Sequence, residues 1–157
     1  MTIKRVLVPV DFSRDSLAAL DYALEFTKPF EAEVVLLHVI EPVYYATPAD
    51  LYATSPNLAL LLEEQRRAAQ AQLEKLVQKI AGTRRKVRAL LKSGAPAQVI
   101  AETAQKPKAD LIIMATHGRT GLAHVLLGSV TERVLRIASC PVLVVRAPKR
   151  RSAAKKR

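Results

Sequence analysis

Aromatic residues are scarce in this sequence, and tryptophan is missing altogether. Aromatic residues make up 4% of the 157 residues, whereas hydrophobic residues make up 50%. A core of this composition must be filled by Ala, Val, Leu and Ile side chains, which suits helices packed on a buried parallel sheet. The chain length is near the commonest size of a domain and allows most of the apolar surface to be buried. We therefore expect one α/β domain.

Long apolar runs and cysteine pairs are also lacking. No uninterrupted apolar run approaches the roughly 18 to 20 residues that cross a bilayer, so we expect a cytoplasmic protein without membrane insertion. Cys140 is the single cysteine and cannot form an internal disulfide. Its neighbours Ser139 and Pro141 favour a small apolar filler at the entrance of a strand. A reactive thiol would instead need nearby cationic groups that lower its pKa.

Acidic residues are missing from the end of the chain. The net charge is +11, and residues 148–157 supply six of the positive charges without an acid, at Lys149, Arg150, Arg151, Lys155, Lys156 and Arg157. We expect a folded domain over 1–147 and a disordered basic tail over 148–157. Such a tail would attract nucleic acid through its charge, but no aromatic residue is interleaved for base stacking. A solubilising, solvated end is the alternative interpretation.

Strand patterns alternate with helical periodicity along the chain. Strands are predicted over 5–10, 33–40, 86–94, 110–116 and 141–146, and helices are predicted between them. Ser13 is placed to cap the first helix, and Pro96 fixes the first turn of the helix after Gly94. Repeated alternation of strands and helices specifies right-handed parallel crossovers, with ligands beyond the carboxyl ends of the strands.

The middle of the chain departs from this alternation. Residues 41–57 contain three prolines and three tyrosines and are predicted to form a long loop. Its tyrosines would cover a bound base or pack on their own domain. A helix follows to about Ala81, with one apolar stripe of Leu62, Ala69, Leu73, Leu76 and Ile80. The next strand is predicted to be one-sided, with Val87, Ala89 and Leu91 inward and Lys86, Arg88, Leu90 and Lys92 outward, as near a sheet edge.

Gly118 and Gly128, two of the five glycines, lie between the fourth predicted strand and the helix that follows it. Gly118 follows the fourth predicted strand, nine residues separate it from Gly128, and a helix follows. Bare backbone there would admit an anion, and the helix N-terminus carries roughly half a positive charge. Ser129-Val130-Thr131-Glu132 also reads as a capping box. The glycines alone are therefore consistent with two interpretations, a phosphate-binding site and an ordinary helix start.

Five segments together resemble the universal stress protein family. They are VLVPVDFS at Val6, VVLLHV at Val34, SGAPAQVI at Ser93, ADLIIMATHGRTGL at Ala109 and LLGSVTERVLRIASCPVLVV at Leu126. The resemblance covers about Ile3 to Arg146. It implies a Rossmann-like open five-stranded parallel sheet, with strand order 3-2-1-4-5 and helices on both faces. It further implies a nucleotide-dependent regulator of the stress response that forms a homodimer through the C-terminal strand, 141–146.

The ATP-binding branch of that family carries a glycine motif, which this chain matches with one change. The pattern is Gly, two residues, Gly, nine residues, Gly and Ser or Thr. Here Ala115 replaces the first glycine, whereas Gly118, Gly128 and Ser129 match. Alanine is the smallest residue with a Cβ and is tolerated wherever φ is negative. We therefore expect binding that is weakened or slightly shifted, not abolished.

The resemblance implies an adenine nucleotide, ATP or else ADP or AMP, bound with Mg²⁺. The adenosine end would be lined by Pro9, Val10 and Asp11, with backbone groups of Val39 meeting the adenine. The ribose and phosphates would be wrapped by Met114, Ala115, Thr116, His117, Gly118, Arg119, Thr120 and Gly121. The phosphate chain would accept from Gly128, Ser129, Val130 and Thr131. Asp11 would hold a ribose hydroxyl or the Mg²⁺ ion, or it merely ends the first strand.

Two other functions are alternatives to a protein that only binds a nucleotide. An ATP hydrolase or phosphotransferase needs a water or acceptor in line with the γ-phosphate. The sequence has no Gly-Lys-Ser or Gly-Lys-Thr P-loop, and Asp11 is the one candidate acid, so no catalytic residue is predicted and slow hydrolysis stays open. His117 and His124 lack the spacing of a metal site. A module tethered to nucleic acid by its basic tail is the third hypothesis.

Overall fold

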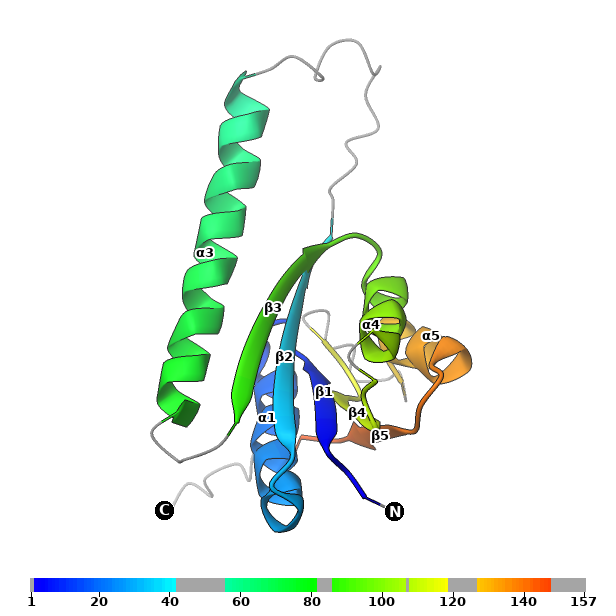
Figure 1. Ribbon diagram of the computed structural model, residues 1–157. Helices are drawn as coiled ribbons and strands as arrows, with labels where there is room; N and C mark the ends of the chain where they lie inside the picture. The colour runs from blue at the N-terminus through cyan, green and yellow to red at the C-terminus, as the bar shows by residue number, and fades with distance from the viewer. Residues whose placement is uncertain (1, 42–55, 82–85, 107, 119–126, 148–157) are drawn as a thin grey trace, which may run out of the picture.

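The fold is an open parallel sheet with helices on both faces (Figure 1). The structure is a computed structural model that describes residues 2–41, 56–81, 86–106, 108–118 and 127–147. The strands are β1 (Arg5–Pro9), β2 (Glu33–Ile40), β3 (Val87–Ser93), β4 (Leu111–Ala115) and β5 (Val142–Val145). The helices are α1 (Arg14–Thr27), α3 (Pro56–Ala81), α4 (Pro96–Gln105) and α5 (Ser129–Ile137), with the short 3-10 helix η1 (Lys28–Phe30). The sheet order is β3-β2-β1-β4-β5, as predicted.

Two apolar clusters hold the helices on the sheet. On one face, side chains of β1 and β2 such as Val6 and Leu36 pack with Leu73 of α3 and with α1. On the other face, Leu7 and Ile112 pack with residues of α4 and α5. Burying one such side chain contributes about 1.5–3 kcal/mol, so strands that are apolar on both faces belong in the middle of this sheet.

The helix starts follow the capping chemistry that the sequence predicts. The Ser13 side chain is the N-cap of α1 and accepts a hydrogen bond of 3.2 Å from the Ser16 N–H. Gly94 has φ 141°, a conformation that side chains rarely allow, and Pro96 is the first residue of α4. Both helices therefore begin within a few residues of the carboxyl ends of their strands.

The predicted apolar stripe of α3 is wrong at its first member. Ala69, Leu73 and Ile80 are buried, but Leu62 is 46% exposed. The reason is visible in Figure 1, where the N-terminal part of α3 extends past the end of the sheet. A periodic pattern identifies the face of a helix but not how far the neighbouring layer reaches.

The edge strand β3 is only partly as predicted. It is the first strand of the sheet, and Val87, Ala89 and Leu91 pack against the α1 and α3 side. Leu90, predicted to face outward, packs instead against the cluster beneath α4. Both faces of this edge strand are therefore partly covered by helices.

Some predictions concern residues outside the described ranges. These are most of the tyrosine-containing loop, the tail 148–157, His124, and the site residues Arg119, Thr120 and Gly121. Within the part of the chain that the structure describes, no helix is both long and apolar enough to pass through a membrane.

Candidate nucleotide site

A cavity of about 840 Å³ opens at the carboxyl ends of the central strands. Its size falls within the range of small-molecule sites, roughly 300 to 1,000 Å³. Its walls include twelve of the predicted site residues, namely Pro9, Val10, Asp11, Val39, Met114, Ala115, His117, Gly118, Gly128, Ser129, Val130 and Thr131. Thr116 is described but does not line the cavity. The crevice lies where the crossovers on the two sides of β1 diverge, as expected for such a sheet.

Asp11 connects the end of β1 to the glycine loop. Its Oδ1 accepts a hydrogen bond of 3.0 Å from the Ser13 N–H, and its own N–H donates to Ser16 Oγ at 3.3 Å. The other carboxylate oxygen faces Gly118, because a Cβ added to that glycine would lie 2.6 Å from Asp11 Oδ2. Asp11 therefore ends the strand and also forms part of the cavity wall.

The first turn of α5 is attached to the end of β4. The Gly128 N–H donates to the Thr116 carbonyl at 2.7 Å, and the buried Thr131 hydroxyl donates to the Ala115 carbonyl at 2.9 Å. The predicted capping box is wrong: Gly128, not Ser129, is the N-cap, and no side chain caps this helix among the described residues. The helix therefore begins at the cavity with uncapped amides, the arrangement that binds anions.

Val39 lies beside a gap in the sheet ladder. The register of β1 and β2 ends at the pair of Pro9 and Leu37, where the Val10 N–H donates to the Leu37 carbonyl at 2.8 Å. Alternation along β2 directs the N–H and carbonyl of Val39 toward the β1 side, beyond that last pair. These two backbone groups therefore border the cavity, where a planar ring with a donor and an acceptor could meet both.

The sequence interpretation missed a second wall made by helices. Gln65, Ala68, Ala69 and Gln72 of α3 line the cavity, as do Pro96 and Ile100 of α4. The α3 residues follow the spacing i, i+3, i+4 and i+7, which places them on one helix face. That spacing, with two alanines between two glutamines, was the available signal.

His38 was missed as well. It is the one titratable side chain inside the apolar run 34–40, it lines the cavity, and it is only 6% exposed. Its Nδ1 lies 2.7 Å from the Val10 carbonyl oxygen. A buried polar group within an otherwise apolar strand is itself a sequence signal for a specific hydrogen bond.

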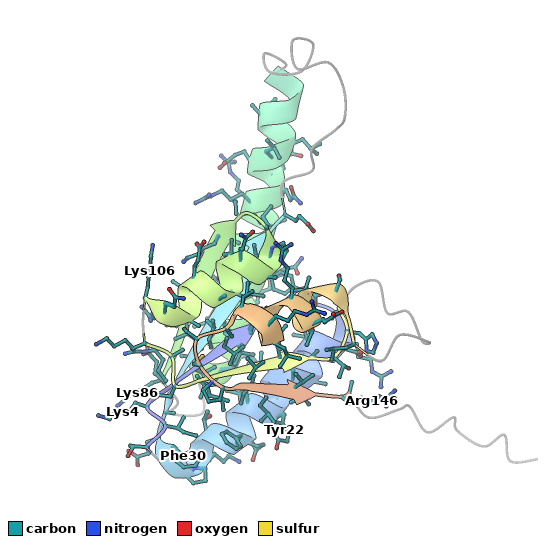
Figure 2. The ribbon with its side chains drawn as sticks, turned by 90° about the vertical axis from the view of Figure 1, so that its right-hand side faces the viewer. Lys4, Tyr22, Phe30, Lys86, Lys106 and Arg146 are labelled. Atoms are coloured by element: carbon teal, nitrogen blue, oxygen red, sulfur yellow. The ribbon has the colours of Figure 1, made fainter. Side chains whose placement is uncertain are left out.

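The cavity wall carries no lysine or arginine among the described residues. Figure 2 shows Lys4, Lys86 and Lys106 on the side of the molecule away from Arg146, with Lys106 apart from the other two. An anion in the cavity would therefore be held by backbone amides and the α5 dipole. No group of three or more His, Cys, Asp or Glu side chains converges in the described part of the chain. Asp11 would be the protein ligand for a cation carried in by phosphates.

Cys140 lies apart from the cavity. It packs beside Ala138 and Val142 against the cluster under α4 and α5, immediately before β5. Burial raises the pKa of its thiol above the ordinary value, and the negative charge of Asp110 raises it further. The thiol is therefore a packing group, as predicted.

The architecture defines a doubly wound α/β protein with a ligand-sized crevice at the switch point of its sheet. The chain belongs to the universal stress protein family, whose model matches residues 2–146. A universal stress protein of Methanocaldococcus jannaschii is 38% identical over 148 residues, covering 94% of this chain and 84% of that relative. One from Bacillus subtilis is 30% identical and covers 90% of this chain and 98% of its own.

Solved structures show the same fold. That of a second M. jannaschii universal stress protein superposes with a TM-score of 0.82 at 31% identity, covering 95% of this chain and 99% of the other. A universal stress protein solved in complex with cAMP superposes with a TM-score of 0.58 at 27% identity, covering 92% and 98%. Some members of the family therefore bind an adenine nucleotide.

Proposed function

We propose that this chain is a cytoplasmic regulator of the stress response that binds an adenine nucleotide, ATP foremost, and acts as a homodimer. The observation that carries the nucleotide proposal is the cavity itself, which unites Asp11, Gly118 and the uncapped start of α5. A related protein that binds cAMP supports the same ligand class. In this proposal occupancy by nucleotide sets the partner choice of the dimer.

The base would lie against the N–H and carbonyl of Val39, and the ribose beside Asp11. The phosphates would pass Gly118 and end at the amides of Ser129 and Val130, and Asp11 would hold either a ribose hydroxyl or a Mg²⁺ ion that the phosphates bring. Ala115 fits this mode, because it is absent from the residues whose φ is positive, so its methyl group costs no backbone strain.

The homodimer proposal rests on the free edge of the sheet. Among the described residues, β4 is the one strand that pairs with β5, and none of them pairs with the other side of β5. Two helices that contact β5 carry exposed apolar side chains, which are Leu135 and Ile137 on α5 and Tyr22 on α1. Figure 2 shows Tyr22 next to β5. Pairing of two such edges about a two-fold axis needs only one surface.

The nucleotide proposal is tested by denaturing the purified protein and identifying any released nucleotide by mass spectrometry. Calorimetric titration with ATP, ADP, AMP, cAMP and adenosine then ranks the ligands. Ser129→Pro removes one amide at the first helical position, where proline is tolerated. We expect this variant to bind ATP about tenfold more weakly, with adenosine affinity unchanged.

Ser129→Ala is the matched comparison, because it removes the hydroxyl of the motif but keeps the amide, and it should lose less ATP affinity than Ser129→Pro. A wild-type protein that carries no adenine nucleotide and binds none of the five ligands would refute the proposal. Equal loss of ATP and adenosine affinity in Ser129→Pro would refute the placement of the phosphates at α5.

A further inference from the structure

We propose that His38 is a positioning residue of the nucleotide site. Its imidazole binds the Val10 carbonyl, which would otherwise accept a hydrogen bond from the Val39 N–H and extend the sheet by one more pair. This inference rests on the function proposed above. In this inference, the buried His38 side chain, which lies outside the glycine motif, keeps the base-binding crevice open.

The first observation is where the ladder between β1 and β2 stops. Continuing the register by one step would pair Val10 with His38 and direct the Val39 N–H to the Val10 carbonyl. That pair is not formed between these described residues. The Val10 carbonyl instead meets His38 Nδ1 at 2.7 Å. The imidazole has therefore replaced a backbone donor at this acceptor.

The second observation concerns the protonation and packing of the ring. A carbonyl oxygen can only accept, so Nδ1 must carry the proton. The ring also packs against Phe12, with 4.5 Å between the ring centroids. Phe12 has φ 62°, a conformation that a residue with a side chain rarely adopts. His38 therefore contacts both residues that flank Asp11 and stabilises the turn presenting that carboxylate.

Two consequences follow for a ligand. While the His38 imidazole binds the Val10 carbonyl, the Val39 N–H does not donate to that carbonyl. It is therefore available to donate a hydrogen bond to a base. If an apolar side chain replaced the imidazole, the Val10 carbonyl would be buried without its partner, and Val39 is the nearest backbone donor in register. The strands would then pair one step further and narrow the crevice.

The test compares adenine nucleotide affinity in three variants by calorimetry. His38→Leu should bind ATP about tenfold more weakly than the wild type. His38→Asn places an amide nitrogen where Nδ1 was and should recover most of the affinity. Val34→Ala, on the same face of β2 but remote from the cavity, should lower the thermal midpoint without changing the affinity.

A second readout uses the protein without ligand. Amide exchange at Val39 should be fast in the wild type, slowed by ATP, and slow without ligand in His38→Leu because the ladder has closed. ¹⁵N spectra should show the His38 proton on Nδ1. Unchanged affinity in His38→Leu would overturn this inference and leave the proposed function standing. A wild type that binds no adenine nucleotide would overturn both.

Discussion

At the scale of single residues, Gly118 shows that the structure can require a glycine for a reason that the sequence motif does not contain. The glycine motif predicts bare backbone for a phosphate, whereas the nearest neighbour of a Cβ at this position is the carboxylate of Asp11, 2.6 Å away. The residue that Gly118 accommodates is 107 positions earlier in the chain. Local sequence cannot reveal such a contact.

Gly118→Ala should displace the Asp11 carboxylate, since 2.6 Å is too short for any carbon–oxygen contact. We expect a loss of about 1–3 kcal/mol in the free energy of unfolding, measured by urea denaturation, and weaker nucleotide binding. In an Asp11→Ala background, which has already lost the hydrogen bond from the Ser13 N–H, adding Gly118→Ala should cost no further stability. If the single variant is as stable as the wild type, the close contact is wrong.

Cys140 allows a prediction of pH dependence. Because burial, with a smaller effect from Asp110, raises the pKa of its thiol, the thiolate fraction at pH 8 is lower than in an unfolded chain. Alkylation by iodoacetamide should therefore be slower in the folded protein than in urea. The rate should keep rising with pH beyond the point where an ordinary thiol levels off. Faster reaction in the folded state would contradict the assignment.

Residue-scale prediction from the sequence succeeded where chemistry is local. Ser13 caps α1 through a bond to a residue three positions away, and this was predictable. Ser129 was misassigned because Gly128 can take the N-cap conformation itself, with φ −69° and ψ 150°. His38 was overlooked because its partner, Val10, lies 28 residues away in sequence.

At the scale of elements, every predicted strand and helix that the structure describes is present. Boundaries held because each is fixed by a local feature, such as Pro96 at the start of α4. The sequence pattern could not predict which turns of a helix pack against the sheet. Leu62 on α3 is periodic with buried residues yet exposed, and the N-terminal part of α3 extends past the end of the sheet (Figure 1).

The attachment of α5 to β4 gives a prediction at this scale. Thr131→Val keeps the shape of the side chain but removes the hydroxyl that donates to the Ala115 carbonyl. Leaving that acceptor without its partner should cost about 1–3 kcal/mol in unfolding free energy. Nucleotide affinity should fall as well, because the first turn of α5 loses one of its two bonds to β4. Thr131→Ser keeps the hydroxyl and should retain both properties; a Thr131→Val variant as stable as Thr131→Ser would show that this hydrogen bond does not hold the helix on β4.

At the scale of the whole molecule, the proposed dimer depends on one side of β5. The Ile112 N–H donates to the Pro141 carbonyl, and the Thr116 N–H donates to the Val145 carbonyl. The backbone N–H and carbonyl groups of odd-numbered residues in β5 therefore face β4. The backbone of Val144 therefore faces outward. Val144→Pro removes an outward N–H and spares the pairing with β4. We expect this variant to be a folded monomer by sedimentation and circular dichroism, and the wild type to sediment as the proposed dimer.

Leu143→Pro is the contrasting variant, because its N–H faces β4 and its loss should destabilise the fold itself. A wild-type protein that sediments as a monomer at micromolar concentration would contradict the homodimer.

The central place of β1 has a consequence for synthesis on the ribosome. Its partners come from both halves of the chain, since β2 follows within 40 residues whereas β4 begins at Leu111. The first three strands can associate as soon as they emerge, but one side of β1 must wait until β4 has been translated. A nascent chain stalled after β3 should therefore expose the unpaired edge of β1 and bind chaperones. Extension of the chain through β5 should release these chaperones.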